Sequence, residues 1–137
     1  STQALFRVIA SDGVNTSQAQ SAGVFTVYNK GPLPLITSPG ANACVTAGQQ
    51  VMLAAEAYDF QDGPLPGSQL AWSADFQADL GTGRQLSVNF VPVGNHQVTL
   101  RATNSAGLTA TANVAFTVSA SPCSAAKTAL YLPLVIR

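Results

Sequence analysis

The stretch that decides the fold is residues 69–118, which contains QLAWSA at 69–74, RQLSVNF at 84–90, HQVTLRAT at 96–103 and TATANVAFTV at 109–118. Apolar and polar residues alternate in each run, so successive side chains would point to opposite faces of an extended chain. A period of two is typical of a strand with one face in a core and the other in water. Several such strands at short, regular spacing predict an all-β fold, a β-sandwich.

The same alternation predicts which side chains form the core. Leu70, Trp72 and Ala74 share one face of their strand, so we expect Trp72 inside the sandwich rather than exposed as a platform for a sugar. No long segment has a period of 3.6 residues, and helix is therefore not expected. The remaining expected segments are strands at 35–37, 51–58, 84–90, 95–103 and 109–118, and a loop at 40–50. Residues 75–83 are expected to be irregular, with a very short strand as the alternative.

Composition excludes several classes of partner. Charged residues make up 9% of the 137 residues, and the net charge is zero; an average soluble domain has about 25%. Because there is no basic stripe, we expect no nucleic-acid partner. No apolar run approaches the roughly 20 residues that cross a bilayer, so no transmembrane segment is expected. A weakly charged surface suits packed arrays, and it equally suits a plain extracellular module with neutral surfaces.

The N-terminal residues repeat a pattern found near the other end of the chain. Phe6 and Val8 alternate as Val98 and Leu100 do, and residues 25–27 repeat residues 116–118 as Phe-Thr-Val. We therefore expect residues 1–29 to be the terminal hairpin of a preceding, incomplete domain, with strands at 5–10 and 24–27. The alternative is a chance similarity between two hairpins.

Such a hairpin needs a cover for its apolar face, because an isolated pair of strands is marginally stable at best in water. The side chains concerned are Phe6, Val8, Phe25 and Val27. Either the main domain or another chain would cover them. We expect contact with another chain, and residues 30–34 to be a stiff, proline-containing linker.

Residues from 58 onward resemble a bacterial immunoglobulin-like domain close to the PKD group. The resemblance is carried by YDFQDG at 58–63, by Trp72 and by residues 98–109, and it covers about residues 33–119. The usual PKD sequence Trp-x-Phe-Gly-Asp-Gly is replaced by WSADFQ at 72–77. The resemblance implies a sandwich of about seven strands, here residues 35–122, in a secreted or cell-surface multidomain protein. Such domains are usually spacers, adhesion modules or carbohydrate-associated modules.

In a sandwich of this kind, the loop after the first strand and the end of the last strand lie at one pole. Cys44 and Cys123 are placed at these two points. We expect a disulfide between them, and hence an oxidising compartment. The alternatives are two free thiols or bridges to other chains.

Two aspartates, Asp59 and Asp62, are a weak calcium candidate and the only expected cofactor site. Calcium needs six to eight oxygen ligands, so backbone carbonyls would have to complete the site. The alternative is that both side chains cap nearby N–H groups in a turn. Asp75 and Asp79 lie at the other end of the strand that carries Trp72, which is too far away to share an ion.

No catalytic residue is predicted. The sequence has no nucleophile elbow, phosphate loop or dinucleotide-binding pattern. His96 is the only histidine, and we expect it at the surface at the start of a strand. With the cysteines bridged, it cannot form a zinc site with them.

Residues 123–137 form an apolar tail in which Leu130, Leu132, Leu134 and Ile136 alternate. The tail is interpreted either as a short C-terminal edge strand or as a sorting tail. We expect a non-enzymatic extracellular structural or adhesion module that assembles with other copies or neighbouring domains through sheet edges, as a filament or surface-array subunit. The alternatives are an accessory glycan- or peptide-binding module at the C-terminus of a secreted hydrolase, and a proteolytic remnant.

Overall fold

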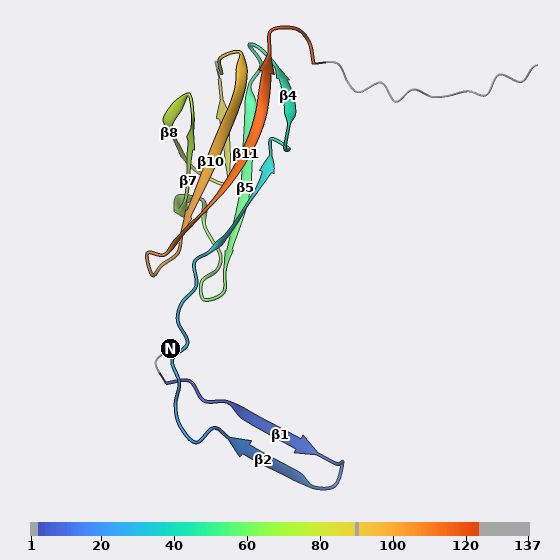
Figure 1. The fold of residues 1–137 in the computed structure, drawn as a ribbon, viewed down its shortest axis with the longest axis vertical. Helices are drawn as coiled ribbons and strands as arrows, with labels where there is room; N and C mark the ends of the chain where they lie inside the picture. Colours follow the sequence, from blue (N-terminus) through green and yellow to red (C-terminus); the bar gives the residue numbers. More distant parts are fainter. Residues whose placement is uncertain (1–2, 90, 124–137) are drawn as a thin grey trace, which may run out of the picture.

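The computed structural model describes residues 3–89 and 91–123. The described chain is all β apart from one 3-10 turn, η1 (Gly67–Gln69). Figure 1 shows an elongated sandwich joined by an extended linker to a separate hairpin. The strands are β1 (Arg7–Ser11), β2 (Thr16–Gln20), β3 (Leu33–Ser38), β4 (Ala43–Thr46), β5 (Val51–Asp59), β6 (Gly63–Pro64), β7 (Leu70–Ala74), β8 (Gln77–Thr82), β9 (Gln85–Val88), β10 (Gly94–Thr103) and β11 (Thr109–Ser119).

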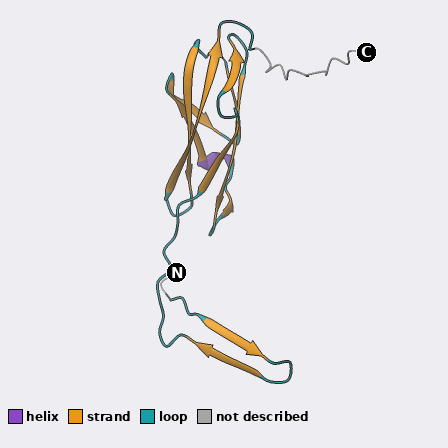
Figure 2. Cartoon of the chain, turned by 45° about the vertical axis from the view of Figure 1, so that its right-hand side comes forward, coloured by secondary structure: helices purple, strands orange, loops and turns teal. Residues whose placement is uncertain are grey.

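Two sheets form the sandwich, as predicted. One sheet has five strands in the order β4-β11-β10-β7-β8, and the other joins β3, β5 and β6, with β9 also paired to β5. Figure 2 shows the strands of the sandwich running along its long axis, with η1 as the single helical turn. The described part of the sandwich has nine strands, against about seven expected, because it includes the two-residue β6 and the edge strand β4.

The core lies where the alternation places it. Along β5 buried and more exposed residues alternate, and in β10 Val98, Leu100 and Ala102 are fully buried. Trp72 is 2% exposed, and its indole Nε1 donates a hydrogen bond to the Gly83 carbonyl oxygen at 2.8 Å. The predicted core position of Trp72 is therefore confirmed, and its one polar atom has a partner.

Two edge strands lie where loop or irregular chain was expected. Cys44 is in β4, which pairs in parallel with β11, and residues 77–82 form β8 against β7. Both strands lie at an edge of the sheet. Neither strand contains a fully buried residue, so neither has the alternation of buried apolar side chains by which a strand is recognised in the sequence.

The N-terminal hairpin differs from the expected one in its second strand. β1 pairs with β2, so the expected strand at 24–27 is wrong; Phe25 makes only an isolated bridge with Ala4. The Asp12 carboxylate accepts hydrogen bonds from the Val14 and Asn15 amides, and this tight turn starts the return strand at once. The return strand reads TSQAQ, which has little apolar content to predict it.

The two hairpins correspond in part of their backbone pairing. Along the first strand of each hairpin the offset is 92 residues, and Ala4 bridges Phe25 as His96 pairs with Phe116. Along the return strand the offset is 93 residues in β2, where Ala19 pairs with Val8, and 91 residues at Phe25. The bridge at Phe25 therefore repeats the pairing of Phe116, while the chain between β2 and Phe25 is two residues longer than the matching part of β11.

Candidate functional site

The apolar face of the N-terminal hairpin is exposed, whereas the matching face of β10–β11 is buried. Phe6, Val8, Phe25 and Val27 are 63%, 50%, 46% and 46% exposed. Their counterparts in the sandwich are at most 2% exposed, namely Val98, Leu100, Phe116 and Val118. Among described residues 3–30 none is buried, so the main domain does not cover this face. Contact with another chain stays a prediction.

The linker between hairpin and sandwich is held at its C-terminal end. The Lys30 carbonyl oxygen accepts a hydrogen bond from Asn104 Nδ2 at 3.1 Å, and Pro32 is buried. A Cβ atom at Gly31 would lie 3.3 Å from the Thr109 carbonyl oxygen, so a side chain there would force the linker away from β11. The linker is thus fastened to the turn between β10 and β11.

A small polar network lies at the same pole of the sandwich. Asp59 is fully buried; one carboxylate oxygen accepts from the Gln61 and Asp62 amides, and the other from Asn104 Nδ2 at 3.0 Å. The Asn104 hydrogen bond, helped by these amides, holds the pKa of Asp59 below its ordinary value against the effect of burial. The network joins loops that are distant in sequence.

The second aspartate of the network also bridges two loops. The Asp62 carboxylate accepts hydrogen bonds from Ser105 N at 2.6 Å and from Ser105 Oγ at 2.7 Å. These contacts tie the β5–β6 turn to the β10–β11 turn. Both turns lie beside the linker at the lower end of the sandwich in Figure 1.

The contacts of Asp59 and Asp62 are those of turn capping. Their oxygens accept from N–H and O–H groups, and the described residues contain no cluster of three or more side chains able to hold a metal. This arrangement does not offer a ready set of calcium ligands, because calcium requires several free oxygens. Calcium binding at these residues stays a prediction.

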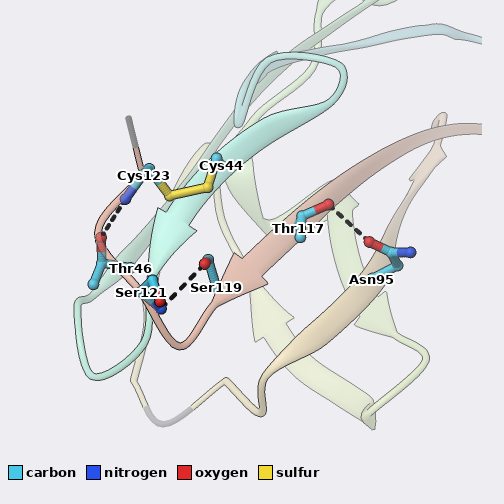
Figure 3. Close-up of a disulfide and its surroundings, with 7 residues drawn as sticks. All are labelled: Cys44, Thr46, Asn95, Thr117, Ser119, Ser121 and Cys123. Atoms are coloured by element: carbon cyan, nitrogen blue, oxygen red, sulfur yellow. Dashed lines mark hydrogen bonds between the residues drawn. A yellow bond between two sulfur atoms is a disulfide. The ribbon is translucent and has the colours of Figure 1, made fainter. Parts of the chain in front are cut away.

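The structure contains the Cys44–Cys123 disulfide, as the pole argument predicts. The two Cα atoms are 5.8 Å apart, and the cysteines are 79 residues apart in sequence. Figure 3 shows the bridge joining β4 to the chain that leaves β11, beside the hydrogen bond from the Cys123 amide to Thr46 Oγ1. The bridge closes the pole opposite the linker.

His96 is packed rather than exposed, contrary to the expectation of a surface residue. Its side chain is 10% exposed, and its ring lies edge-on against Phe76 with centroids 5.0 Å apart. Nε2 lies 2.8 Å from the Pro92 carbonyl oxygen, and Nδ1 lies 3.2 Å from an Asp75 carboxylate oxygen. These contacts give His96 a structural position at the start of β10.

A shallow hollow of about 550 Å³ lies over the outer face of β3 and β5. Leu33, Leu35 and Tyr58 line it, together with the charged residues Glu56 and Arg84. The Tyr58 ring is half-exposed and meets Phe60 edge to face, with centroids 6.0 Å apart. The volume of the hollow is within the range of small-molecule sites.

Some expectations concern residues that the structure does not describe. The proposed assembly positions Leu130, Leu132, Leu134 and Ile136 lie outside the described residues. Among the residues that are described, no helix is long and apolar enough to cross a membrane.

Two paired sheets with a five-stranded layer define an immunoglobulin-like sandwich. The PKD domain family matches residues 35–118, which is more than half of the chain. The chain therefore belongs to the PKD family, even though WSADFQ at 72–77 departs from the usual family sequence.

One solved structure supports this fold, and a second is more distant. A Clostridium thermocellum structure described as CbhA fibronectin(III)-like modules has a TM-score of 0.57 at 18% identity, covering 86% of this chain and 64% of that one. The immunoglobulin domains 1–5 of Sidekick-1 give a TM-score of 0.39 at 18% identity, covering 85% of this chain and 25% of that one. The chain thus spans less than two thirds of either structure. The comparison with curated proteins found no match.

The likeness to the CbhA modules extends beyond the sandwich. Residues 33–137 are 105 of the 137 residues, or less than 80% of the chain, so a match covering 86% must include part of the first 32 residues.

PKD and immunoglobulin-like domains are typically non-catalytic, and PKD domains are usually extracellular. The disulfide fits an oxidising compartment.

Proposed function

We propose that this chain is a non-enzymatic structural or adhesion part of an extracellular protein, and that residues 1–29 are the last hairpin of a preceding module of the same kind. The observation that carries this proposal is the bridge between Ala4 and Phe25, which repeats the pairing of His96 with Phe116 in β10–β11. One hairpin is covered by a second sheet, and the other exposes the same face. A module that supplied the missing strands would bury that face.

Assembly would then proceed through incomplete sheets. Neighbouring domains of the parent protein, or other copies of the chain, would provide the strands that cover Phe6, Val8 and Phe25. Contacts of this head-to-tail type propagate into filaments unless they close. The apolar residues Leu130, Leu132, Leu134 and Ile136 would add a further strand at a sheet edge.

A graft tests the proposal with residues of this chain alone. Residues 33–95 are fused directly ahead of Ala4, so that Ala4 follows Asn95 as His96 does; Cys44 in the grafted copy is replaced by alanine. If β1–β2 is the last hairpin of such a module, the graft completes a second sandwich. We expect the amides of β1 and β2 to exchange rapidly in the original chain, where no residue of the hairpin is buried, and to become protected against hydrogen exchange in the graft.

Two substitutions in adjacent positions make a matched control for the graft. Val8 corresponds to the buried Leu100 and Ile9 to the exposed Arg101, while in the chain itself Val8 and Ile9 are 50% and 57% exposed. V8D should abolish the protection that the graft creates, because it places a charge in the new core, and I9D should leave it unchanged. Equal effects of the two substitutions, or an unprotected hairpin in the graft, would contradict the proposal.

A second candidate function rests on the hollow over β3 and β5. Its apolar walls, the half-exposed Tyr58 and the charged Glu56 and Arg84 fit an accessory module that binds a glycan or a peptide for a secreted hydrolase. A glycan and peptide array should show binding that Y58A removes and M52A keeps; Met52 is equally exposed on β5 but is not part of the hollow. An array without binders would argue against this function.

A further inference from the structure

We infer that the pole of the sandwich at which the linker enters is an interface for the preceding module. This pole, called the linker pole below, consists of the β5–β6 turn with Phe60 and the β10–β11 turn with Leu108. The inference rests on the proposed function, since it needs a preceding module. It adds the surface on which that module would pack.

The linker between the two modules would be short. Because Phe25 corresponds to Phe116, Val27 and Tyr28 correspond to Val118 and Ser119. β11 ends at Ser119. The preceding module would therefore end at Tyr28, and four residues, 29–32, would separate it from β3. Four fully extended residues span at most about 14 Å, so the two modules would lie close together.

Most of this short linker is not free to move. Lys30 is hydrogen-bonded to Asn104, Gly31 packs against the backbone of Thr109, and Pro32 is buried. Only Asn29 remains between Tyr28 and the fastened segment. A module attached through one free residue would contact the linker pole in most of its orientations.

Large apolar side chains are exposed on both sides of the proposed interface. On the two turns of the linker pole, Phe60 is 63% exposed and Leu108 38%, and Tyr28, at the end of the preceding module, is 82% exposed. Exposed large apolar side chains are typical of a surface for interaction. A preceding module packed on the linker pole would cover Phe60 and Leu108 and bury its own Tyr28.

The polar network holds in place the two turns that carry Phe60 and Leu108. Asp62 bonds to Ser105, and the Asn104 side chain accepts from the Leu108 amide while donating to Asp59. The turns that carry Phe60 and Leu108 are therefore held relative to each other and to Lys30. A preorganised surface binds with less loss of conformational entropy than two independent loops would.

The experiment uses the two-module segment of the parent protein, with residual dipolar couplings measured in both modules. We expect both modules to fit one common alignment frame. The triple variant Y28S, F60S and L108S should lose this common frame, so that each module needs its own. V93S is the matched control, because Val93 is 58% exposed in the loop before β10, at the opposite pole; it should keep the common frame.

Three results would overturn the inference, and they separate it from the proposed function. If β1 and β2 are protected from exchange but the wild-type modules orient independently, the modules do not pack at the linker pole. The proposal that a preceding module covers the hairpin is then still supported. If β1 and β2 are unprotected in the two-module segment, the proposed function fails too. If coverage of the linker pole depends on protein concentration, a second copy occupies it instead.

Discussion

The two β-hairpins of this chain have similar antiparallel pairing and very different surroundings. In β10–β11, Leu100 is fully buried and Phe116 is 2% exposed; in β1–β2 the matching Val8 and Phe25 are 50% and 46% exposed. The comparison separates what a hairpin determines by itself from what a second sheet adds. Local pairing and turn geometry are present in both, and burial is present in one. Most of the stability should therefore lie in the sandwich, because burial of apolar area is the main favourable term in folding.

The largest expected difference between the regions comes from the disulfide. Replacing Cys44 and Cys123 by alanine removes a link across 79 residues, which we expect to cost roughly 4 kcal/mol in the chain-entropy account. The hairpin contains no cysteine, so its amide exchange should not change. Urea unfolding followed by the fluorescence of Trp72, the only tryptophan, measures the loss; a change below about 1 kcal/mol would contradict it.

Matched truncations in the two hairpins should differ next. L100A deletes a fully buried side chain, and we expect a loss of about 3 kcal/mol. V8A truncates the corresponding exposed side chain and should change stability by less than about 0.5 kcal/mol. Both are measured by urea unfolding. Similar losses for the two variants would show that the hairpin face is covered in solution.

The corresponding turn residues give a smaller contrast. N104A removes the hydrogen bonds to Lys30, Asp59 and the Leu108 amide from a buried site, and should cost about 2 kcal/mol. D12A removes only the exposed turn contacts to Val14 and Asn15, and should leave the unfolding of the sandwich unchanged. N104A should also speed proteolytic cleavage of the linker at Lys30. Unchanged cleavage would mean that Asn104 does not hold the linker.

The smallest effect is a pH dependence, which in each region should come from that region's own aspartate. Hydrogen bonds lower the pKa of Asp59, chiefly the one from Asn104, and those from Asn15 and Val14 lower the pKa of Asp12. A lowered folded-state pKa adds stability above the ordinary value of about 3.9. That stability is lost as the pH falls through the folded-state pKa.

For the sandwich, the urea midpoint should therefore be level above about pH 4 and fall below it. D59N should flatten this decrease, although it lowers stability at neutral pH because its amide would face the Asn104 amide group. D12N should leave the acid decrease of the sandwich unchanged, because Asp12 contacts only the hairpin turn. If the urea midpoint of D59N decreases below about pH 4 as steeply as that of the original chain, Asp59 is not the cause of the decrease.

Features encoded in neighbouring residues could be predicted. The alternation of Leu70, Trp72 and Ala74 predicts a strand and its buried face, and the repeat of Phe6 and Val8 in Val98 and Leu100 predicts a second hairpin of the same kind. The cysteine pairing followed from the expected topology. In each case the signal lies within one strand, or in a topology that the strand pattern already implies.

Features that depend on distant partners could not be predicted. β4 pairs with a strand more than 70 residues away, and Asn104 meets Lys30 and Asp59 at sequence separations of 74 and 45. Nothing in the residues next to Cys44 or Asn104 indicates these contacts. The aspartates at 59 and 62 were recognised as a pair, and the structure adds the donors that they bond.

By itself the sequence determined where the chain extends and which face of each strand is apolar, because side chains alternate along every strand regardless of its neighbours. The tertiary structure alone decided which apolar faces are covered. Burial requires a second sheet in the right place, and the residues of a hairpin do not specify whether that sheet is present. For this reason two hairpins with the same pattern are core in one region and exposed surface in the other.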